Sequence, residues 1–101
     1  MATRATIEIE GFKGAKIYKH WDGYPEAMLP WLREFHEDFL ENRGWDPSYE
    51  LAQCLRYACK NAKNFGLDDD PYTGWGIIGY HLACGENYNY VLKQDGSVEV
   101  Q

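Results

Sequence analysis

Hydrophobic and polar residues alternate near the start of the chain. Between residues 5 and 10, Ile7 and Ile9 are separated by polar residues, which is the period-2 pattern of a half-buried strand. Two glycines between residues 11 and 14 favour a short loop, and Ala15–Trp21 then resumes an extended pattern. The sequence therefore predicts a hairpin formed by residues 5–10 and 15–21.

The middle of the chain changes to a period of three to four residues. Apolar side chains recur at Met28, Leu32, Phe35 and Phe39, with charged residues opposite, so we expect an amphipathic helix from Pro25 to about Arg43. A second helix is expected to begin at Pro47 behind the N-cap Asp46 and to close at Gly66. Its predicted buried stripe is Leu51, Leu55, Ala58, Ala62 and Phe65.

Extended patterns return at the end of the chain, over Trp75–Ala83, Tyr88–Lys93 and Ser97–Gln101. The pair Asp95-Gly96 predicts a two-residue type I′ turn between the last two strands. The element order is then ββααβββ, and neither helix joins two obviously parallel strands. We expect one α+β domain over residues 1–101, with a mostly antiparallel sheet and both helices packed on one face.

Composition narrows the range of partners. The formal net charge of -6 disfavours binding to nucleic acid or to anionic lipid, because both depend on positive protein charge. No apolar run approaches the roughly 18 residues needed to span a bilayer. Three cysteines follow a polar N-terminus, so reduced thiols and a cytoplasmic location are expected.

The junction Trp21–Pro25 has two interpretations. Turn chemistry explains most of it, since Asp22 can bond its own backbone, Gly23 can take positive φ, and Tyr24 before Pro25 is held extended. Alternatively, His20, Asp22 and Tyr24 are displayed together as an acid/base group in a small-molecule or metal-dependent enzyme.

Metal and cofactor motifs are not recognisable in the sequence. His20, His36, His81 and Cys84 have no zinc-like spacing, and we expect core thiols and ordinary surface histidines. The acidic run at residues 68–70 lacks the glycine and glutamate positions of a helix-loop-helix calcium site. We therefore predict no catalytic residues, no metal and no cofactor.

Aromatic residues make up 16% of the chain, and many fall in the predicted strands. Most are expected to cover the helix-facing core, whereas the opposite sheet face or its rim is a candidate protein interface, since Tyr and Trp are common interface anchors. The candidate binding surface comprises His20, Trp21, Asp22, Tyr24, Tyr72 and Trp75.

The box Tyr18-Lys19-His20-Trp21-Asp22-Gly23-Tyr24-Pro25, followed by Leu29-Pro30 and an amphipathic helix, resembles a family of small uncharacterised proteins from bacteria, archaea and their viruses. The resemblance implies a bacterial or viral setting and a stand-alone domain. It implies no activity and no catalytic residues.

These observations favour a non-enzymatic accessory or regulatory protein that acts by binding another protein or a second copy of itself. The alternative is the enzyme with a site at His20, Asp22 and Tyr24.

Overall fold

The computed structural model describes residues 3–61, 74–82 and 84–101. Its elements are β1 (Ala5–Ile9), β2 (Ala15–Lys19), α1 (Pro25–Asn42), α2 (Pro47–Asn61), β3 (Trp75–Gly79), β4 (Tyr88–Leu92) and β5 (Val98–Val100). The predicted order ββααβββ and the α+β class are confirmed. The predicted strands end one to four residues too late.

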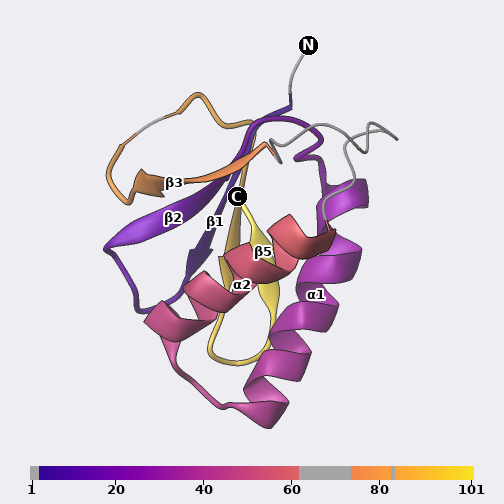
Figure 1. The fold of residues 1–101 in the computed structure, drawn as a ribbon, viewed down its shortest axis with the longest axis vertical. Coiled ribbons are helices and arrows are strands. Elements are labelled where there is room, and N and C mark those ends of the chain that lie inside the picture. The colour runs from indigo at the N-terminus through magenta and orange to yellow at the C-terminus, as the bar shows by residue number, and fades with distance from the viewer. Residues whose placement is uncertain (1–2, 62–73, 83) are drawn as a thin grey trace.

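The five strands form one sheet in the order β3-β2-β1-β4-β5. Three neighbouring pairs are antiparallel, and the central pair β1–β4 is parallel, with Ile7 opposite Tyr90. The expectation of a mostly antiparallel sheet is therefore confirmed. Figure 1 shows α2 crossing in front of the sheet with α1 beside it.

The core lies between the helices and one face of the sheet. Its fully or almost fully buried members are Ala5, Ile7, Ile9, Ile17, Met28, Leu32, Leu51, Cys54, Tyr90 and Leu92. Alternation along β1 places its odd-numbered residues on this face. Burying each large aliphatic side chain contributes about 1.5–3 kcal/mol to folding, so this shared apolar face holds both helices on the sheet.

The buried stripe of α2 differs in part from the prediction. Leu51 and Ala58 are buried as expected, but Cys54 is fully buried whereas Leu55 is only half-buried. The remaining predicted members, Ala62 and Phe65, lie outside the described residues, as does the predicted closing residue Gly66. The buried side of α2 is thus rotated slightly about the helix axis, toward α1, compared with the prediction.

The predicted type I′ turn at Asp95-Gly96 is wrong. A type I′ turn needs positive φ at both central residues, yet only Gly96 has it, at φ 94. The backbone N–H of Lys93 donates to the carbonyl of Ser97 (2.9 Å), and Gly96 donates back to the carbonyl of Lys93 (3.0 Å). The connection is a three-residue loop in which Gly96 forms the left-handed bulge position.

None of the described helices is long and apolar enough to cross a membrane.

Candidate functional site

The corner between β2 and α1 is built differently from the prediction. Asp22, not Gly23, takes the left-handed conformation, at φ 58. Gly23 is required for space, because a Cβ there would lie 2.5 Å from the Cβ of Ala5. Its N–H donates to the Thr3 carbonyl (2.8 Å), and its own carbonyl accepts the Tyr90 hydroxyl (2.6 Å). The corner is thereby fastened to the segment that precedes β1 and to β4.

Two residues of the predicted binding surface, His20 and Trp21, are in contact. The Nδ1 atom of His20 lies 2.8 Å from the Tyr18 hydroxyl, and its ring meets Trp21 edge-on at 5.1 Å. Among the described residues, no hydrogen bond joins His20 to Asp22 or Tyr24. Tyr24 stands at the N-cap of α1 and is 39% exposed.

Trp75 belongs to the helix side of the sheet. Its ring meets Trp31 of α1 at 5.7 Å, and the Lys19 ammonium lies 4.3 Å from its centroid. Burial lowers the pKa of Lys19, against an opposing effect of the Asp22 charge. Tyr72 lies outside the described residues. The Trp21 ring lies beside Gly74, the residue before Trp75, so the fold brings part of the predicted set together.

A chain of six aromatic rings instead runs between the helices, from Trp75 to Tyr49. Successive centroids are 5.6 to 6.0 Å apart, a normal range for stabilising aromatic pairs. In order, the rings are Trp75, Trp31, Tyr57, Phe35, Phe39 and Tyr49. At the far end the Arg43 guanidinium lies 4.6 Å from the Tyr49 ring and pairs with Asp46 at 3.2 Å.

The last four rings of this chain, Phe35, Phe39, Tyr49 and Tyr57, line a surface groove of about 290 Å³ between α1 and α2. We call it the aromatic groove. Tyr49 is 44% exposed and Tyr57 is 36% exposed, so large apolar surface remains open to solvent. The polar and charged residues that complete the lining are Asp38, Asn42, Arg43, Gln53 and Arg56.

Beneath the groove, His36 and Glu50 form a fully buried pair. The Nδ1 of His36 lies 2.6 Å from Oε2 of Glu50, and its Nε2 lies 2.6 Å from the carbonyl oxygen of Lys93. A carbonyl can only accept, so Nε2 carries a proton. One further proton is shared between Nδ1 and the carboxyl group, which leaves the pair with no net charge. The pair ties α1, α2 and the β4–β5 hairpin together.

Charge and burial act in opposite directions on His36. Burial alone lowers its pKa, but hydrogen bonds to Glu50 and to the Lys93 carbonyl, together with the negative charges of Glu50 and Asp95, raise it above its ordinary value. The other Glu50 oxygen, Oε1, is buried and has no hydrogen-bond partner among the described residues. The expectation that His36 is an ordinary surface histidine is wrong.

Cys54 and Cys84 are poorly suited to nucleophilic chemistry. Burial, and then the Glu50 charge, strongly raises the pKa of the Cys54 thiol, and burial also raises that of Cys84. A high pKa keeps a thiol protonated and unreactive. Within the described ranges, no three His, Cys, Asp or Glu side chains are grouped closely enough to hold a metal ion.

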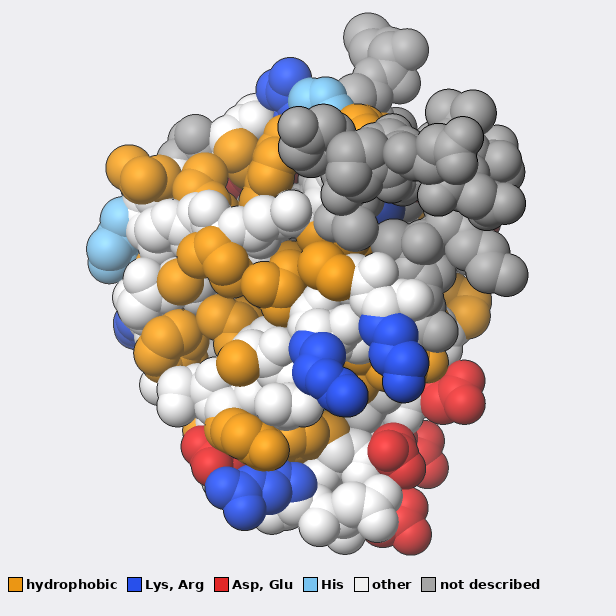
Figure 2. All heavy atoms as spheres, viewed as in Figure 1, with side chains coloured by type: hydrophobic (Ala, Val, Ile, Leu, Met, Phe, Trp, Pro, Cys, Tyr) orange, Lys and Arg blue, Asp and Glu red, His pale blue; other side chains and the backbone are white. Residues whose placement is uncertain are grey.

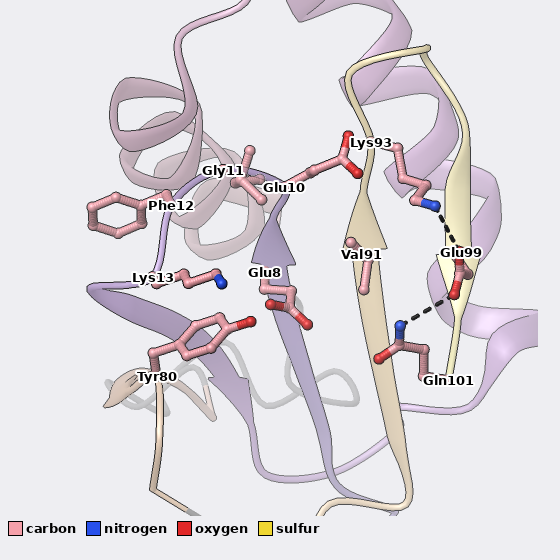
Figure 3. A pocket seen from close by; sticks show the side chains of 11 residues that line it. Glu8, Glu10, Gly11, Phe12, Lys13, Tyr80, Val91, Lys93, Glu99 and Gln101 are labelled. Atoms are coloured by element: carbon pink, nitrogen blue, oxygen red, sulfur yellow. Dashed lines mark hydrogen bonds and ion pairs between the residues drawn. The ribbon is translucent and has the colours of Figure 1, made fainter.

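The sheet face opposite the helices carries a polar pocket of about 280 Å³ (Figure 3). Glu8, only 8% exposed, accepts a hydrogen bond from Asn89 Nδ2 at 2.6 Å, and Asn89 Oδ1 in turn accepts from the Thr6 hydroxyl at 2.6 Å. Tyr80 points its hydroxyl at the same carboxylate. The hydrogen bond between the Tyr80 hydroxyl and the Glu8 carboxylate is the largest cause of the raised pKa of Tyr80, and burial is the next. The Glu8 carboxylate in this pocket is thus firmly oriented.

Comparisons of the chain with protein family models, with curated proteins and with solved structures found no match.

Proposed function

We propose that this protein is a non-enzymatic accessory or regulatory domain that binds another protein chain through the aromatic groove between α1 and α2. The observation that carries the proposal is the exposure of Tyr49 and Tyr57 on a supported platform of rings. Tyrosines of this kind anchor protein interfaces, because they bury much apolar area at a low cost in conformational entropy.

The platform is stiff, which favours binding. Tyr57 stacks on Trp31 at 5.9 Å and touches Phe35 at 5.6 Å, and Tyr49 packs against Phe39 at 6.0 Å. Rings that are already held in place lose little freedom when a partner arrives. The mixed polar rim, with Arg56 and Gln53 on α2 and Asp38 on α1, has the apolar centre and polar border of a protein interface.

The enzyme alternative has less support. His20 is engaged by Tyr18 and Trp21, and the charge of Asp22 acts on Lys19. The thiols of Cys54 and Cys84 have raised pKa values. We also infer a reducing compartment such as the cytoplasm, because an odd number of cysteines, three, does not suit a disulfide framework.

Quantitative affinity capture from the cells that make the protein tests this function. The bait variants are Tyr57→Glu and Tyr49→Glu in the groove, and Leu82→Glu as a matched control, since Leu82 is 64% exposed on another part of the surface. Protein partners, including untagged copies of the chain, should be lost with both groove variants and retained with the control. Equal capture by all baits, after circular dichroism has shown them folded, would contradict the proposal.

A further inference from the structure

Apart from the Arg43–Asp46 ion pair at the turn between the helices, exposed charges are sorted by sign along the two sides of the aromatic groove. Within the described part of α2, every exposed charged side chain is basic, namely Arg56 and Lys60. On α1, Asp38 lines the groove, and the exposed Glu34 and Glu41 lie one turn before and after it on the same side of the helix. Figure 2 shows acidic side chains along the right-hand edge over α1, and Lys and Arg side chains nearer the centre over α2.

An apolar seam with acidic residues on one side and basic residues on the other is complementary to a second copy of itself. When two such faces meet about a two-fold axis running along the seam, α1 of each copy lies over α2 of the other, so acid faces base on both sides. A two-fold axis across the seam would place acid over acid. Electrostatic complementarity therefore selects the dimer whose two-fold axis runs along the seam. Because the axis is two-fold, each contact between α1 and α2 occurs twice in the interface.

Building on the proposed protein-binding function, we propose that the partner seated on the aromatic groove is a second copy of this chain, in a two-fold dimer with α1 of each protomer against α2 of the other. The carboxylates of Glu34, Asp38 and Glu41 then face Arg56 and Lys60 of the partner. Tyr49 and Tyr57 form the apolar centre, protected from water by these charged borders.

Sedimentation equilibrium of the purified chain tests the dimer, with two charge-reversed variants. One carries Arg56→Glu with Lys60→Glu, and the other carries Glu34→Lys, Asp38→Lys and Glu41→Lys. Each variant alone opposes like charges at both contacts, so its dimer dissociation constant should rise about 100-fold or more. An equimolar mixture should restore association, because the acidic α2 of one variant meets the basic α1 of the other and the unchanged helices meet as before.

Arg33→Glu serves as the matched control. Arg33 is exposed on α1 but lies on the side of the helix away from the groove, so this reversal should leave the dissociation constant unchanged within about 3-fold. Added salt should weaken the wild-type dimer and the mixed dimer alike, since exposed charge pairs are screened.

A wild-type chain that stays monomeric up to millimolar concentration overturns the dimer, as does a mixture of the two folded variants that fails to associate. The proposed function has a separate outcome. If the wild type is monomeric while another protein is captured in a manner that depends on Tyr57, the groove is a binding site and only the identity of its partner is wrong. A dimer that both reversals weaken and their mixture restores supports the inference.

Discussion

The imidazole of His36 and the carboxylate of Glu50 meet at 2.6 Å, and neither side chain is exposed to solvent. Fourteen residues separate them along the chain, and the loop between the helices brings them together. The same imidazole bonds the Lys93 carbonyl, so one ring positions both helices and the last hairpin. The platform of the aromatic groove depends on how those helices sit together.

Removing one partner of this pair should destabilise the fold strongly. Glu50→Ala leaves His36 buried without its counter-charge, for which we expect a loss of about 3–5 kcal/mol in the free energy of unfolding. The exposed neighbour variant Glu37→Ala should cost less than about 0.5 kcal/mol. Urea denaturation followed by circular dichroism measures both. Similar stability of the two variants would mean that the pair does not hold the helices.

Replacing both partners should be milder than removing one. A His36→Phe, Glu50→Met double variant substitutes apolar groups of similar size, and it removes the unpartnered Glu50 oxygen along with the charges. The carbonyl of Lys93 still loses its partner. We expect the double variant to be more stable than Glu50→Ala in the same urea experiment. A double variant less stable than the single one would contradict this account.

Stability should fall as the pH rises through the folded-state pKa of His36. That pKa is raised above its ordinary value near 6.5, so the folded protein binds this proton more tightly than the unfolded chain does. The resulting stabilisation is complete below the unfolded pKa and disappears as the pH rises through the folded one. A pH series of urea midpoints for the wild type and for the His36→Phe, Glu50→Met double variant isolates the effect, because the double variant lacks both members of the pair and should not show this decline.

Much of the architecture could be predicted because it is encoded locally. The apolar period of Pro25–Asn42 and the alternation in Ala5–Ile9 each depend on neighbours in sequence. The parallel β1–β4 pairing and the His36–Glu50 contact join distant segments, and no local pattern encodes them. One signal for the pair was present, since His36 continues the apolar stripe of Met28 and Leu32 at steps of four residues. A polar residue on such a stripe predicts a buried partner.

The candidate binding surface at the corner Trp21–Pro25 stays a prediction. The aromatic groove, lined by Phe35, Phe39, Tyr49 and Tyr57, is a different surface. Phe35 and Phe39 fit the apolar stripe of the first helix, and no pattern in the sequence singles out Tyr49 or Tyr57. The sequence specifies which rings lie on each helix, but the packing of α1 against α2 decides which rings stay exposed.

Gly23 and Asp22 should respond in opposite ways to substitution. Gly23→Ala places a methyl group 2.5 Å from the Ala5 Cβ, and we expect a loss of about 1–3 kcal/mol from this overpacking. Asp22→Gly relieves a left-handed residue at φ 58 and should keep or slightly increase stability. Thermal melts of the two single variants check the prediction. A tolerated alanine at position 23 would show that the corner has room to shift.

The polar pocket supplies a titration test. The Glu8 carboxylate, by its hydrogen bond and its charge, raises the pKa of Tyr80, so Glu8→Gln should lower that pKa toward the ordinary tyrosine value. NMR of the tyrosine ring carbons across alkaline pH follows the titration directly. Glu10→Gln is the control, because Glu10 lines the same pocket and does not contribute to the raised pKa of Tyr80. An unchanged Tyr80 titration in Glu8→Gln would contradict the contact.

The most direct measurement is photo-cross-linking from position 57 in the cells that make the protein. A benzophenone amino acid replacing Tyr57 keeps an aromatic side chain in the groove, and the same group at Leu82 reports contact on another exposed site. The account predicts a protein adduct, and specifically a covalent dimer of the chain, from position 57 and little or none from position 82. Equal labelling at both positions, or no protein adduct from position 57, would contradict the claim that the aromatic groove binds protein.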